Sequence, residues 1–137
     1  MDLLTDFYPL YNYIKKHHKL LDPSRFKCEP MNWYDNPRMF LELKPLEQTI
    51  LIAWIFNILA PSKGINSDID SYQIKHLFND SLLGFYISNG QLKGAMIIAG
   101  YNSKDMNNQN WHFNIKQASI TNLHRTKANI ISSKIKS

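Results

Sequence analysis

The predicted fold is decided by residues 71–115, which read SYQIKHLFND SLLGFYISNG QLKGAMIIAG YNSKDMNNQN WHFNI. Apolar residues recur at helical spacing on both sides of a glycine-containing connection, which indicates two short helices. Ser88 is a good N-cap for the second helix, and Gly100 suits the C′ position that ends it. Large apolar and polar residues alternate over residues 111–115, a pattern typical of a half-buried strand. The stretch therefore predicts two helices, a polar loop and a strand.

Two longer helices are expected upstream. Apolar spacing predicts an amphipathic helix over about Asp6–Leu20. A second helix, Pro45–Ala60, opens on a proline and is apolar on almost all faces. Such a helix is buried, either as the central scaffold of the core or as one that also faces a partner, for example in a homodimer. Between them, residues 25–40 predict an irregular linker, in which Trp33 and Tyr34 either anchor the chain to the core or stack on a base.

The order helix, turn, helix, polar loop and aromatic strand resembles the winged helix-turn-helix superfamily. More narrowly, YISNGQLKGAMIIAGY followed by NWHFNI resembles the C-terminal DNA-binding domain of viral and phage helicase-primases. It is also similar to small proteins carried by phages and mobile elements of Gram-positive bacteria. The resemblance covers about 45 of the 137 residues. It implies a mainly α protein with a small β wing (α+β), in which N-terminal helices precede a winged helix-turn-helix core.

This interpretation divides one compact domain into three segments. Residues 1–44 would form the N-terminal helix and aromatic linker, residues 45–127 the winged-helix core, and residues 128–137 a basic tail. The charge is uneven along these segments. Residues 1–103 contain ten Lys/Arg and ten Asp/Glu, whereas residues 104–137 contain six Lys/Arg and one Asp, so the net charge of +5 lies in the C-terminal part. A basic segment attracts polyanions, although the last ten residues could equally form a solvated, disordered tail.

The resemblance and the charge together indicate a nucleic-acid surface. The helix start would offer backbone N–H groups to phosphate, and the wing would make a second contact. The outer face of the first short helix suits either phosphate contacts or simple solvation. Lys93 is the only basic residue on the second helix. This favours contacts with phosphates and with DNA shape, or a protein interface, over direct recognition of the nucleobases. The predicted contact residues are Ser88, Asn89, Gln91, Lys93, Lys104, Asn107, Asn108, Asn110, Lys116, Arg125 and Lys127, with additional contacts from Tyr72, Lys75 and His76.

No pattern in the sequence predicts catalysis. There is no glycine-rich phosphate loop, no pair of Cys or His at metal-ligand spacing and no nucleophile-elbow motif. We therefore expect no catalytic residue, metal or cofactor. The single Cys28 and the acidic N-terminus favour a reducing, cytoplasmic location. The apolar run Ile50–Ala60 is too short to cross a membrane.

The sequence thus favours a small non-enzymatic accessory or regulatory protein of a phage or mobile genetic element, which binds duplex or single-stranded DNA. The competing hypothesis is a protein-binding module. Such a module would dock on a replication enzyme, or would inhibit a host defence nuclease in the manner of an anti-CRISPR protein. The apolar Pro45–Ala60 helix and the aromatic N-terminal region could supply that surface.

Overall fold

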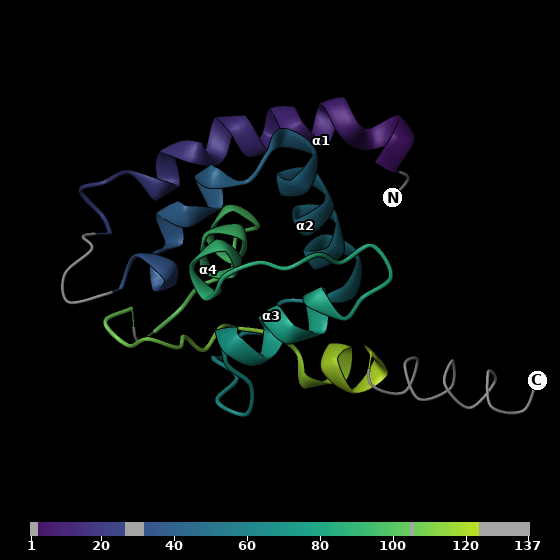
Figure 1. The fold of residues 1–137 in the computed structure, drawn as a ribbon. Helices are drawn as coiled ribbons and strands as arrows, with labels where there is room; N and C mark the ends of the chain where they lie inside the picture. Colours follow the sequence, from purple (N-terminus) through teal and green to yellow (C-terminus); the bar gives the residue numbers. More distant parts are fainter. Residues whose placement is uncertain (1–2, 27–31, 105, 124–137) are drawn as a thin grey trace, which may run out of the picture.

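The computed structural model describes residues 3–26, 32–104 and 106–123. Residues 117–123 form a short helical segment at the end of these ranges. Figure 1 shows α1 along one side of the molecule, α3 on the opposite side and α4 between them. The named elements are α1 (Leu3–His17), η1 (His18–Leu21), η2 (Trp33–Asp35), η3 (Pro37–Glu42), α2 (Pro45–Ile58), α3 (Ser71–Asn79) and α4 (Asn89–Ile98), where η denotes a 3-10 helix.

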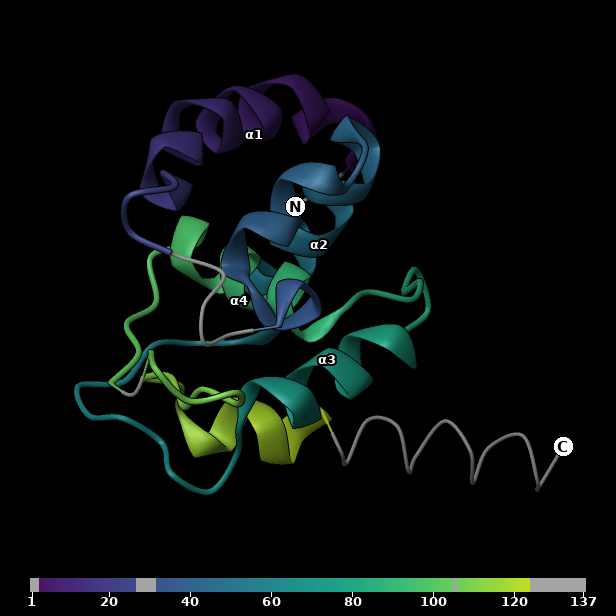
Figure 2. The same ribbon diagram turned by 60° about the vertical axis from the view of Figure 1, so that its left-hand side comes forward.

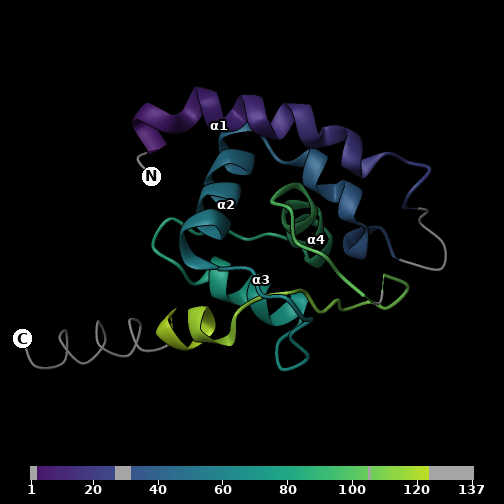
Figure 3. The same cartoon turned by 180° about the vertical axis from the view of Figure 1, so that it is seen from behind.

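The central helix of the fold is α4. It contacts η1, η2, η3, α2 and α3, and eight of its ten residues are buried. Figure 2 shows it in the middle of the molecule, between α1 and α3. α2 instead contacts α1 and α4 and lies below α1 in Figure 3, with Leu46 and Phe56 exposed. α2 is a core helix, as expected, because Leu51, Ile52 and Ile55 are buried, but α4 is the more central of the two helices.

Two glycines allow η3 to lie directly against α4. A Cβ added at Gly94 would overlap the Pro37 carbonyl oxygen and lie 2.6 Å from Phe40 Cβ. A Cβ added at Gly90 would overlap the Asn36 carbonyl oxygen. Gly90 and Gly94 are four residues apart, so they lie on one face of the helix. The close approach inferred for Gly94 is thus made to a packed segment of the same chain.

The predicted helix ends are confirmed. Ser88 Oγ accepts a hydrogen bond from the Gln91 backbone N–H at 3.1 Å, and Gln91 Oε1 accepts one from the Ser88 N–H at 2.8 Å, forming a capping box. Gly100 adopts φ +95° after α4. The Tyr101 N–H then donates to the Met96 carbonyl at 3.0 Å, which completes a Schellman motif. Asp70 caps α3 in the same way as Ser88 caps α4.

The predicted β wing is wrong, and with it the winged α+β fold. The described residues contain no β-strand; the segment 111–115 makes only two isolated bridges, Ser103 with Phe113 and Pro61 with Ile115. The alternation in this segment is nevertheless correct as a burial pattern. Trp111, Phe113 and Ile115 are buried, whereas the two polar residues between them are partly exposed.

The segment fails to form a strand because its backbone hydrogen bonds go to an irregular connection. The Asn66 and Ser71 N–H groups donate to the carbonyls of Phe113 and Trp111 at 2.8 and 2.7 Å. Asn114 uses its side chain as well, accepting from the Asn102 N–H at 2.7 Å. These partners lie in loops and at the start of α3 instead of in an extended neighbour, so no regular ladder develops. The described fold is helical, and the polar loop 102–110 returns toward the start of α4.

In the described part of the chain, no helix combines the length and apolar character needed to cross a membrane.

Candidate nucleic-acid interface

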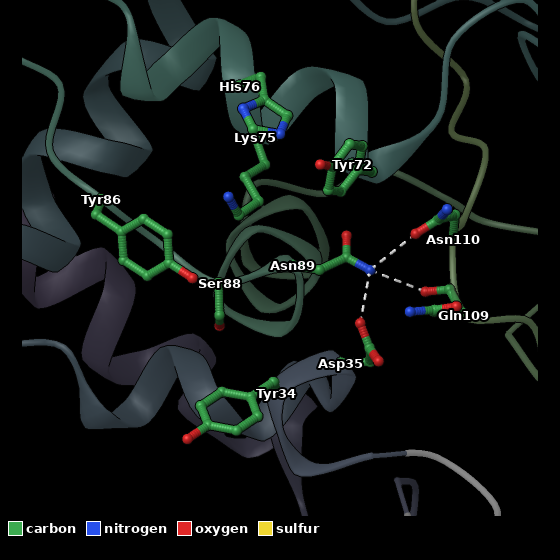
Figure 4. A pocket seen from close by; sticks show the side chains of 10 residues that line it. All are labelled: Tyr34, Asp35, Tyr72, Lys75, His76, Tyr86, Ser88, Asn89, Gln109 and Asn110. Carbon is green, nitrogen blue, oxygen red and sulfur yellow. Dashed lines mark hydrogen bonds between the residues drawn. The ribbon is translucent and has the colours of Figure 1, made fainter.

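An open pocket of about 530 Å³ lies at the N-terminal end of α4. Figure 4 shows its walls, which come from α3, from η2, from the segment that leads into α4 and from the end of the polar loop. Six of the sequence-predicted contact residues meet there, although they come from three separate segments. They are Tyr72, Lys75 and His76 of α3, Ser88 and Asn89 at the start of α4, and Asn110 of the loop.

Three exposed tyrosines surround the pocket. Tyr34, Tyr72 and Tyr86 are 66%, 51% and 76% exposed, although each is a large side chain that could have packed inside. The Tyr72 ring also meets the His76 ring edge-on, with centroids 4.5 Å apart, as expected for residues four apart on a helix. Exposed aromatic rings around a concave site are suited to stacking on flat ligands.

Lys75 is buried in the same pocket and is only 6% exposed. Its Nζ lies 4.7 Å from the ring centroid of Tyr86 and 5.8 Å from that of Tyr72, so both rings make cation–π contacts with it. Among the described residues no hydrogen bond or ion pair to this ammonium is found. Burial lowers the pKa of Lys75 below its ordinary value. A cation that lines a pocket without a paired anion is a favourable place for an anionic ligand.

Asn89 lies beside Lys75 in the pocket and is 7% exposed. Its Nδ2 lies within hydrogen-bond distance of three acceptors: Asp35 Oδ1 at 3.0 Å, the Gln109 carbonyl at 2.9 Å and Asn110 Oδ1 at 3.1 Å. An amide has two N–H hydrogens, so these acceptors outnumber the donors. Asn89 Oδ1 is buried and accepts no hydrogen bond from the described residues.

The expected role of Lys93 is wrong. Its side chain is fully buried, and its Nζ donates to the Asp35 carbonyl at 2.9 Å and lies 4.6 Å from the Trp111 ring centroid. Burial lowers the pKa of Lys93 to about 8, against the opposing attraction of Asp35. The lysine holds η2 to α4 and cannot enter a DNA groove in this fold. Lys93 is buried because α4 is surrounded by other elements, so that no face of this helix is exposed to solvent.

The other predicted contacts lie outside the pocket. Gln91 is half-buried, and its side chain caps α4. Lys104, Asn107, Asn108 and Lys116 are exposed. Arg125 and Lys127 fall outside the described residues. The predicted contact residues of α3 and of the start of α4 therefore meet in the pocket. Gln91 and Lys93, which were expected to enter or flank a DNA groove, instead cap α4 and hold η2 to it.

Four pocket residues were not among the predicted contacts: Tyr34, Asp35, Tyr86 and Gln109. For Tyr34 the sequence leaves two roles open, anchoring the linker to the core or stacking on a base. Tyr86 could have been found from its neighbours, because Phe85 and Ile87 return toward the core and the residue between them must point outward. Asp35 and Gln109 carry no such local signal.

No group of three His, Cys, Asp or Glu side chains in the described ranges could hold a metal ion. No protein-family model, curated protein or solved structure matches the chain. Its function is therefore inferred from its own residues.

Proposed function

We propose that this chain binds nucleic acid without catalysing a reaction on it, and that the pocket at the start of α4 is the contact site. The observation that carries the proposal is the Lys75 ammonium: its side chain is mostly buried and lines the pocket, it has no anionic partner among the described residues, and Tyr72 and Tyr86 flank it. Nucleic acid supplies what this arrangement lacks, because its phosphates are anions and its bases are flat rings.

The geometry supports both parts of such a contact. Tyr34 and Tyr86 are the more exposed rings, and although Lys75 lies over the Tyr86 ring, their exposed surface is suited to packing against a base. The start of α4 lines the same pocket, and a helix N-terminus favours negative charge. Lys104 and Lys116 are exposed outside the pocket and would add non-specific affinity along a bound strand. A role as an accessory protein of a mobile element, acting in the cytoplasm, remains part of this proposal.

The test is fluorescence anisotropy with the full chain and short labelled strands of DNA and RNA at increasing salt. We expect binding that weakens as salt rises, and about tenfold weaker binding after Tyr86→Ala. Tyr8→Ala is the matched control, because Tyr8 of α1 is 75% exposed but lies outside the pocket. The proposal fails if no strand binds at low salt, or if both tyrosine variants bind equally well.

A second candidate function has its own observation in the connection before α4. Leu82 is fully exposed and Leu83 is 59% exposed, next to the exposed Tyr86. Adjacent exposed leucines on a loop suit insertion into an apolar groove of a partner protein. If Leu82→Ser with Leu83→Ser abolishes function in vivo while strand binding persists, the protein-binding module is favoured instead.

A further inference from the structure

The second unsatisfied group in the pocket is an acceptor, and it restricts the ligand further than Lys75 does. The three acceptors around Asn89 Nδ2 fix the orientation of the amide, because turning it over would place its oxygen against them. Figure 4 shows Asn89 Oδ1 pointing away from these acceptors, toward the wall formed by α3. A buried acceptor without a donor is unfavourable. A ligand in the pocket, or a water molecule in its absence, can supply the missing donor.

A donor is also what the surrounding polar groups favour. The Asp35 carboxylate, the Gln109 carbonyl and Asn110 Oδ1 share only the two hydrogens of the Asn89 amide, so this side of the pocket has surplus acceptors. On the other side stands the cation, Lys75, between two tyrosine rings. A ligand that complements this pocket would therefore combine three features: an anionic group, a flat ring and an N–H donor.

An unpaired nucleotide has all three features. Its phosphate is the anion, its base is the ring, and every common base carries an N–H donor on the Watson–Crick edge. In a duplex the Watson–Crick donors are paired, and an amino hydrogen that remains in a groove belongs to a base whose faces are stacked on its neighbours. Only a single strand, or a base turned out of its stack, therefore offers an N–H donor and a free ring face together. An acidic peptide has donors and anions but does not require three aromatic rings from separate segments.

We propose that the pocket binds one unpaired nucleotide of a single strand, whose Watson–Crick N–H donates to Asn89 Oδ1 while its phosphate lies at Lys75. The ring packs against the exposed tyrosines. This inference rests on the proposed function and adds to it the choice of single strands over duplexes. It also adds a direct contact between Asn89 and the edge of a base.

The test changes the base and leaves the phosphates intact. Strand binding is measured for the full chain with oligothymidylate and with the same strand methylated at N3, which removes the only N–H donor of thymine. We expect at least about fivefold weaker binding of the N3-methylated strand, the effect of leaving a buried acceptor unpaired. A deoxyuridine strand is the matched control, since it lacks only the C5 methyl group and keeps N3–H; it should bind like oligothymidylate. Oligouridylate with and without N3 methylation repeats the comparison in RNA.

The protein side of the test is Asn89→Leu, which keeps the side-chain size and removes the acceptor. It should bind both thymidine strands equally, and Asn57→Leu, at an exposed position on α2, should retain the preference. If Asn89→Leu does not fold, the methylated strand still decides the question with the wild-type chain.

Three results separate the possibilities. Preference for the unmodified single strand over both its N3-methylated form and the duplex supports the inference. Salt-dependent binding with no such preference overturns it and leaves the proposed function standing. Absence of binding to every strand overturns both.

Discussion

The helices α3 and α4 each bury one lysine, and the two lysines are in opposite situations. Lys93 of α4 donates to the Asp35 carbonyl and lies over Trp111, so its ammonium is satisfied within the fold. Lys75 of α3 is also mostly buried, but it faces an open pocket, and its ammonium makes cation–π contacts with Tyr72 and Tyr86 and no hydrogen bond or ion pair that is found among the described residues. Burial alone therefore does not distinguish a structural lysine from a ligand-binding one; the two are distinguished by whether the ammonium has a partner within the fold.

The largest expected effect concerns the packing that keeps α4 buried. Gly94→Val should destabilise the fold by about 3 kcal/mol or more, because its side chain would overlap the Pro37 carbonyl and force η3 away from α4. Gly64→Val is the control, since a Cβ at Gly64 meets nothing within 4 Å. Urea unfolding measures both. Equal loss of stability in the two variants would show that α4 is not packed as described.

The pH dependence of stability should report the buried Lys93. Its folded pKa of about 8 lies below its unfolded value of 10.5, so above pH 8 the unfolded state binds more protons than the folded state. The free energy of unfolding should therefore rise, by about 2 kcal/mol, from pH 8 to about pH 10, where tyrosines begin to ionise in the unfolded chain. Above that range, the raised pKa of Tyr101, about 12, acts in the opposite direction. Urea unfolding at several pH values should show the rise in the wild type and a smaller one in Lys93→Met.

The two lysines should also differ when each is replaced by methionine. Lys93→Met removes the donor to the Asp35 carbonyl; measured near pH 10, where Lys93 is mostly uncharged in the fold, it should cost about 1–2 kcal/mol of unfolding free energy. Lys75→Met removes an ammonium that burial disfavours, so stability should stay unchanged or rise. Thermal and urea unfolding check both variants. A Lys75→Met variant less stable than Lys93→Met would reverse the assignment of the two roles.

The smallest expected effect is on the salt dependence of strand binding. If Lys75 contacts one phosphate, Lys75→Met should reduce the slope of log affinity against log salt by about 0.7, the contribution of one phosphate on a single strand. Anisotropy titrations at several salt concentrations measure this slope. An unchanged slope would place the phosphate contacts elsewhere, for instance at Lys104 or Lys116.

The parts of this fold that could be predicted are those determined locally. Ser88 and Gly100 mark the ends of α4 because capping depends on a few neighbouring residues. The alternation over 111–115 predicts which side chains are buried but not the backbone partners of Trp111 and Phe113, Ser71 and Asn66, which lie 40 and 47 residues earlier in the chain. A periodic pattern indicates which side chains are buried, but it does not indicate which backbone groups form hydrogen bonds with each other. For this reason the sequence predicts a strand where the structure has an irregular segment.

The residues of the candidate site likewise fall into those that the local sequence predicts and those that depend on how distant segments pack. Tyr72 and His76 were found because they share the outer face of one helix. Lys93 was misplaced because a lysine is ordinarily exposed, and its partners Asp35 and Trp111 come from distant segments. The convergence of Tyr34, Tyr72 and Tyr86 depends on how η2, α3 and the start of α4 pack, which no local pattern encodes.

The most direct test of the central claim compares Lys75→Met with Lys16→Met in binding to a single-stranded oligonucleotide at low salt. Both changes remove one positive charge, but Lys16 is exposed on α1 outside the pocket. We predict that Lys75→Met binds about tenfold more weakly with its stability intact, whereas Lys16→Met binds like the wild type. Equal binding by the two variants would contradict the assignment of Lys75 as the lysine that contacts the ligand.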